Sequence, residues 1–83
     1  MKVTLRYFAS IREAIGQSSE VFETEASSVA ALRDALLARG AVYQAVLSRN
    51  CAVRIALNQD VCDEAALLQD NCEVAFFPPV TGG

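Results

Sequence analysis

Hydrophobic and polar residues alternate along several segments of this chain, which is the pattern of strands with one buried face. A strand also fits residues 20–25, but Val21 and Phe22 are adjacent and both favour burial. The pattern therefore does not decide which side chains of this strand point toward the core. A short strand is expected around Val61, after a tight turn over residues 58–60. The clearest alternation covers residues 2–8, 53–58 and 72–77.

Two short segments change from alternation to helical spacing. Residues 9–16 predict a helix that stops at Gly16, because glycine readily adopts the left-handed conformation that ends helices. Residues 41–48 predict a second short helix. Residues 63–70 predict a loop with at most one helical turn, and Asn71 suits the turn that follows because asparagine tolerates the left-handed conformation.

The strongest helical pattern covers residues 29–39. Ser28, or the serine before it, can cap the first turn by accepting a backbone N–H bond. Arg33 and Arg39 lie off the apolar stripe or at its end, and Gly40 is expected to close the helix. The stripe consists of Val29, Leu32 and Leu36 with the alanines between them.

The order of these elements favours an α+β fold. One amphipathic helix can cover only one face of a sheet, so we expect a mixed sheet packed on one main helix. The first and last strands are often central and parallel in such rolls, although the pattern by itself does not prove it. Pro78 and Pro79 cannot donate to a sheet ladder and end the last strand. We therefore expect a domain over residues 1–77 and a protruding tail over residues 78–83.

Composition restricts the functions that are open to this chain. Its 83 residues make one small domain, and 53% hydrophobic residues are enough for a single core. The net charge is −3, without the basic excess of a nucleic-acid binder. The chain has no histidine, which excludes hydrolase mechanisms with a histidine base and every zinc site with a histidine ligand.

The sequence also bears on compartment and metal content. Charges interrupt every apolar run well before the ~20 residues of a membrane span, and no signal-peptide pattern opens the chain. We therefore expect a cytoplasmic protein whose mature chain begins near Met1. Cys51, Cys62 and Cys72 form no C-x-x-C pair, so free thiols are expected rather than a three-cysteine metal site or redox switch.

The last six residues hold both prolines and two of the four glycines. The prolines stiffen the exit from the last strand, and the final glycines have no Cβ that would obstruct entry into a slot. Six extended residues reach about 20 Å, enough to place Gly83 inside a partner's active site. The alternative is a frayed terminus without function. The residues expected to insert are Val80, Thr81, Gly82 and Gly83.

Two phenylalanines fall on the polar faces of their strands, close to the start of this tail. Phe8 ends the first strand, and Phe77 shares its face of the last strand with Glu73. If the two strands are parallel neighbours, the rings lie together and suggest a docking patch rather than packing at the edge of the core. Val61 can extend this patch. Arg12 can pair with a partner carboxylate, but an ordinary solvated charge is nearly as good an interpretation.

Three motifs carry a resemblance that spans almost the whole chain. They are F-A-x-x-R-E-x-x-G at residues 8–16, Asn58-Gln59, and E-V-A-F-F-P-P-V-T-G-G at residues 73–83. Together they resemble the small subunit of molybdopterin synthase, the sulfur-carrier protein of molybdenum cofactor biosynthesis, which has a ubiquitin-like β-grasp fold.

The resemblance implies a mechanism. An ATP-dependent, ubiquitin-activating-like enzyme adenylates the carboxylate of Gly83, and a sulfur donor enzyme then displaces AMP to leave a thiocarboxylate. The tail enters the synthase large subunit, where the sulfur attacks cyclic pyranopterin monophosphate, and two transfers build the dithiolene that holds molybdenum. The resemblance also implies a heterotetramer and no permanently bound cofactor. The expected partner-binding residues are Phe8, Arg12, Val61, Phe77, Pro78 and Pro79.

Other functions stay open. A sulfur carrier can serve thiazole synthesis for thiamine or tRNA thiolation instead, although the Phe-Phe-Pro-Pro-Val-Thr run argues against both. A ubiquitin-like modifier joined to lysines through Gly83 is a different class. A binding module whose tail has no chemistry is the remaining alternative.

Overall fold

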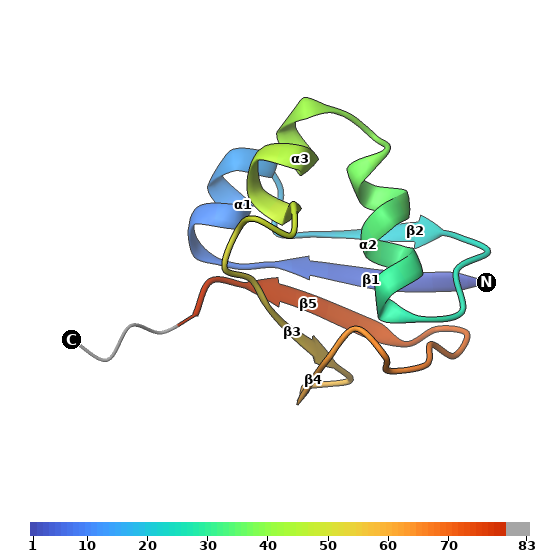
Figure 1. Cartoon of the computed structure of the whole chain (residues 1–83). Coiled ribbons are helices and arrows are strands. Elements are labelled where there is room, and N and C mark those ends of the chain that lie inside the picture. The colour runs from blue at the N-terminus through green and yellow to red at the C-terminus, as the bar shows by residue number, and fades with distance from the viewer. Residues whose placement is uncertain (80–83) are drawn as a thin grey trace.

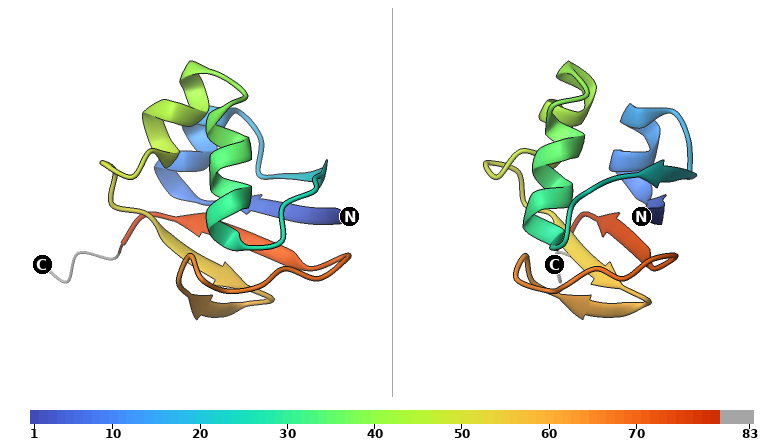
Figure 2. Two further views of the ribbon diagram at one scale, coloured as in Figure 1. Left: turned by 45° about the vertical axis from the view of Figure 1, so that its right-hand side comes forward. Right: turned by 90° about the vertical axis from the view of Figure 1, so that its right-hand side faces the viewer.

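The computed structural model describes residues 1–79, and its strands form one sheet with three helices on one side (Figures 1 and 2). The elements are β1 (Lys2–Tyr7), α1 (Ala9–Ile15), β2 (Ser19–Glu23), α2 (Val29–Leu37), α3 (Ala41–Leu47), β3 (Arg54–Leu57), β4 (Asp60–Cys62) and β5 (Glu73–Phe77). The strand order is β2-β1-β5-β3-β4, and β1 and β5 are parallel neighbours at its centre. The three other pairings are antiparallel. This confirms the α+β prediction and the central, parallel placement of the first and last strands.

The core lies between the sheet and the helices. Alternate residues of β1 and β5 point toward the helices, because successive side chains of a strand face opposite sides. The Tyr7 and Phe76 rings stack there with their centroids 6.2 Å apart. The helix α2 contributes most of the covering side chains, and α1 and α3 add Ile11 and Leu47. The most deeply buried side chains are Val3, Leu5, Tyr7, Val29, Leu32, Leu36, Leu47, Val74 and Phe76.

Several predicted boundaries hold closely. Gly16 ends α1 with a φ of 90°, and Ser28 caps α2 by accepting a hydrogen bond from the Ala31 amide at 3.2 Å. The open question at β2 is resolved, because Phe22 packs against the core while Val21 is 67% exposed on the other face.

Other boundaries differ from the prediction. Phe8 lies just after β1 as the cap of α1, and Cys72 lies just before β5. Residues 63–70 form the predicted loop, with turns and no helical turn. The helix α2 ends at Leu37 with Ala38 as its cap. Gly40, expected to close that helix, instead precedes α3 with a φ of 146°, where it redirects the chain.

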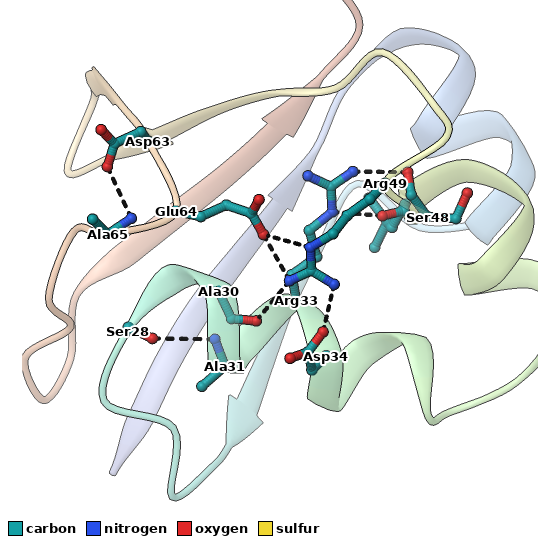
Figure 3. Close-up of polar contacts among 11 residues, drawn as sticks. Ser28, Ala30, Ala31, Arg33, Asp34, Ser48, Arg49, Asp63, Glu64 and Ala65 are labelled. Carbon is teal, nitrogen blue, oxygen red and sulfur yellow. Dashed lines mark hydrogen bonds and ion pairs between the residues drawn. The ribbon is translucent and has the colours of Figure 1, made fainter.

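The prediction that Arg33 lies off the buried stripe is wrong. Its side chain is only 5% exposed, because α3 packs beside α2 and covers it. The guanidinium donates hydrogen bonds to the carbonyl oxygens of Leu47 and Ser48, at 2.6 and 2.8 Å (Figure 3). These carbonyl oxygens lie at the C-terminal end of α3 and accept no hydrogen bond within that helix. The guanidinium supplies the missing donors, and the partial negative charge of the helix end compensates its buried positive charge.

A second arginine fixes the segment that leads into β3. Arg49 forms ion pairs with Asp34 of α2 and with Glu64 of the loop after β4 (Figure 3). It also donates to the carbonyl oxygen of Ala30. Exposed pairs of this kind contribute little singly, but a network that joins three segments restrains their geometry. Arg33 and Arg49 therefore hold the C-terminal end of α3 and the segment that leads into β3 in place.

The turns follow the sequence prediction. Asn58 and Gln59 connect β3 to β4 with positive φ values of 49° and 72°, the conformation that favours tight hairpins. The Asn58 side chain accepts a hydrogen bond from the Glu73 amide at 2.9 Å, which ties this turn to the start of β5. Asn71 adopts a φ of 66° in the predicted turn before β5.

Candidate functional site

The face of the sheet opposite the helices carries an apolar groove of about 550 Å³. Ala56 of β3 and Ala75 of β5 form its floor and are cross-strand neighbours. Each is only 6% exposed, because larger side chains rise around them. The lining consists of Phe8, Ala9, Ala56, Gln59, Val61, Glu73, Ala75, Phe77, Pro78 and Pro79.

Phe8 and Phe77 both line this groove and form one of its walls, so the two side chains share one surface, while their role in docking stays a prediction. Phe8 is 40% exposed and its amide donates to the carbonyl oxygen of Phe76 at 3.2 Å, so it lies beside the end of β5. The Phe8 carbonyl oxygen accepts a hydrogen bond from the Ile11 amide at the start of α1. Phe77 is the last residue of β5 and is partly buried. The parallel pairing of β1 and β5 therefore brings together two rings that are far apart in sequence.

The remaining predicted residues divide into three groups. Val61 of β4 is 63% exposed on the opposite wall, and Pro78 and Pro79 line the end where the tail begins. Arg12 is exposed on α1 outside the groove lining, so its role in binding stays a prediction. The segment predicted to insert, residues 80–83, and with it Gly83 as the predicted reactive residue, lies outside the residues that the structure describes.

One charged pair borders the apolar surface. The Arg6 guanidinium lies 3.6 Å from the Glu73 carboxylate and 5.5 Å from the centroid of the Phe8 ring. Glu73 lines the groove, so Arg6 supplies its counter-ion from the neighbouring strand. The groove thus combines an apolar floor, one aromatic wall and a carboxylate that is paired with an arginine of the neighbouring strand.

Sequence reasoning missed the floor. Ala56 and Ala75 alternate along their strands with core residues such as Ile55 and Phe76, so the alternation places them on the polar face, yet both are buried. The signal available in the sequence was that a small apolar residue occupies the polar face of each strand. It predicts a groove only once β3 and β5 are known to pair with Ala56 opposite Ala75.

The three cysteines are free thiols, as expected. Cys72 is buried in the core, and Cys51 and Cys62 are partly buried. Burial, with the nearby Asp63 carboxylate, raises the pKa of the Cys62 thiol and keeps it in the less reactive protonated form. None of the three lines the groove.

The mixed sheet with central parallel first and last strands, covered on one face by helices, defines a ubiquitin-like β-grasp protein. The chain belongs to the ThiS family, whose model matches residues 5–83. No significant match is found among curated protein sequences.

Solved structures of the same fold cover nearly the whole chain. A Pyrococcus furiosus protein described as subunit 1 of a molybdopterin converting factor is 27% identical, with a TM-score of 0.79 and coverage of 96% of this chain and 99% of that one. In a complex of subunits 1 and 2 of the Helicobacter pylori molybdopterin-converting factor, the matching chain is 25% identical, with a TM-score of 0.71 and full coverage of both chains. SAMP1 from Haloferax volcanii, at 22% identity, TM-score 0.79 and full coverage of both, shows the fold.

The helices of residues 1–79 are all too short to span a bilayer, since the longest, α2, has nine residues.

Proposed function

We propose that this chain is the sulfur-carrier subunit of a molybdopterin synthase. The observation that carries the proposal is the position of the groove, which ends at Pro78 and Pro79, where the tail leaves the domain. A partner seated on the groove is thereby held next to the tail. The family match runs through Gly83, and the similar Helicobacter pylori chain belongs to a complex of two converting-factor subunits, which supports a protein partner.

The proposed chemistry takes place at the carboxylate of Gly83. A carboxylate oxygen attacks the α-phosphorus of ATP and pyrophosphate leaves, which gives an acyl adenylate. A sulfide equivalent from a sulfur donor enzyme attacks the acyl carbon and AMP leaves, which gives the thiocarboxylate. The thiocarboxylate sulfur then replaces an oxygen substituent on a side-chain carbon of cyclic pyranopterin monophosphate, so that a carbon–sulfur bond forms as a carbon–oxygen bond breaks and the oxygen leaves. Water cleaves the acyl carbon–sulfur bond, which restores the carboxylate and leaves the sulfur on the pterin.

The residues of the domain fit a carrier that depends on other proteins for acid–base catalysis. Within residues 1–79, Glu73 is the one ionisable side chain that lines the groove, and Arg6 already neutralises it. The domain supplies the docking surface and the tail supplies reach. The partners proposed are an adenylating enzyme, a sulfur donor enzyme and a large subunit, assembled as a heterotetramer. The adenylation step consumes ATP, so the cytoplasm stays the expected compartment.

Intact-mass spectrometry tests the chemistry directly. The full chain, expressed with its activating enzyme and sulfur donor, should show one oxygen replaced by one sulfur at Gly83. Deleting Gly83, or adding one residue after it, should abolish this exchange and molybdopterin formation without unfolding the domain. A Val42→Ala variant is the matched control, because Val42 is exposed on α3, on the opposite side of the sheet from the groove, and this variant should load sulfur like the wild type.

The outcomes separate the alternatives. A mass fixed at that of the carboxylate under active conditions contradicts a sulfur carrier of any pathway. A thiocarboxylate that supports thiazole or tRNA thiolation, but not molybdopterin formation, assigns another sulfur-transfer pathway. Isopeptide-linked lysine conjugates without sulfur loading assign a protein modifier, the class to which the structural neighbour SAMP1 belongs by name as a small archaeal modifier protein.

A further inference from the structure

Two arginines lie on the groove face of the sheet, and their surroundings differ. Arg6 lies in register with Ala75, and Arg54 lies in register with Phe77 on the other side of β5. Arg54 is two residues before Ala56 on the same strand, so both side chains face the groove side. Arg6 is paired with Glu73, whereas no carboxylate of residues 1–79 lies within ion-pair distance of Arg54.

This difference decides what happens when a partner covers the groove. Glu73 brings its own counter-ion, so an apolar partner surface can cover that pair without an unpaired charge. Arg54 is exposed beside Phe77, at the end of the groove where the tail begins, and carries a positive charge that nothing in the described residues neutralises. Arg6, Arg54 and Glu73 together carry a net charge of +1, whereas the whole chain carries −3.

We propose that Arg54 is a specificity-determining residue of the docking groove and that the docking partner carries a carboxylate facing it. The inference rests on the proposed function, because it concerns the large subunit that would occupy the groove. Charges at the rim of an interface act mainly on the association rate and on its salt dependence, because they steer the encounter of the two surfaces. Arg54 also adjoins Phe77, so a partner carboxylate there fixes the register of docking beside the tail.

A charge reversal compared with a matched control tests this. Arg54→Glu and Lys2→Glu change the net charge equally, but Lys2 begins β1 and lies about 20 Å along that strand from Phe8, at ~3.3 Å per residue. Association of each full-length variant with the large subunit from the same organism is measured at low and high salt. Arg54→Glu should slow association at least about tenfold at low salt and weaken or invert its salt dependence. Lys2→Glu should stay within about twofold of the wild type.

Two further measurements complete the design. Arg54→Gln removes the charge without reversing it and should give an intermediate loss, with the melting temperature of each free variant confirming an intact fold. Acidic residues of the large subunit are replaced by basic ones, one at a time. One of these charge reversals should restore rapid association with Arg54→Glu. If the wild type binds the large subunit but Arg54→Glu and Lys2→Glu associate at the same rate, the inference is overturned and the proposed function stands. Absence of wild-type binding overturns both.

Discussion

Replacing Phe8 by alanine is the most direct test of the groove as a docking surface. Phe8 is 40% exposed and lies outside the buried core cluster, so its side chain still has surface to bury against a partner. Its backbone contacts, the amide to Phe76 and the carbonyl to Ile11, do not depend on the side chain and are kept in the variant. The substitution therefore removes apolar wall while leaving the path of the chain unchanged.

The expected loss follows from the exposed area. An aromatic side chain offers ~200 Å² in total, so 40% exposure leaves about 80 Å² to be covered by a partner. At ~25 cal/mol per Å² this corresponds to about 2 kcal/mol, or about a 30-fold increase in the dissociation constant. Phe8→Leu keeps most of the apolar area and should lose only a few-fold.

Titration calorimetry against the large subunit measures this loss, and thermal unfolding of the free variants checks the fold. Val42→Ala is the matched control, since Val42 is 48% exposed but lies on α3, on the opposite side of the sheet. It should bind like the wild type. The reasoning is refuted if Phe8→Ala binds within about twofold of the wild type, or if Val42→Ala loses as much affinity.

Three further predictions concern stability and the thiols. Arg33→Ala should lower the free energy of unfolding by about 3 kcal/mol, because two main-chain carbonyls lose a charged donor; denaturant titration measures it, and a loss under ~1 kcal/mol would contradict this role. Cys51→Ser and Cys62→Ser should leave sulfur loading unchanged by intact mass, since the proposed function places the sulfur on Gly83; a variant that no longer loads would place sulfur on a thiol. Tyr7→Phe should cost about 1 kcal/mol at neutral pH through its lost bond to Glu20. Burial and Glu20 raise the pKa of Tyr7 in the folded state, so that its contribution is complete below the unfolded pKa near 10 and falls as pH rises above it. The stability difference between the wild type and Tyr7→Phe should therefore shrink above about pH 10, and a constant difference would argue against this origin.

The sequence alone determined the local elements. Alternation predicted the strands, because in a strand with one buried face every second side chain points toward the core. Helical spacing predicted α1, α2 and α3, together with Gly16 at the end of α1 and Ser28 as the cap of α2. The position of Phe8 and Phe77 near the tail followed from the same alternation, once the two outer segments were expected to pair in parallel.

Tertiary structure decided what covers each side chain. Arg33 is buried because α3, a separate helix, packs against α2. The hydrophobic periodicity of α2 cannot predict that a second helix covers this side chain. Ala56 and Ala75 become the floor of a groove only because β3 pairs with β5 in that register. The contrast between Arg6, paired with Glu73, and Arg54, unpaired within the described residues, likewise depends on which strands are adjacent. A local pattern specifies which way a side chain points, whereas its burial and charge compensation come from segments distant in sequence.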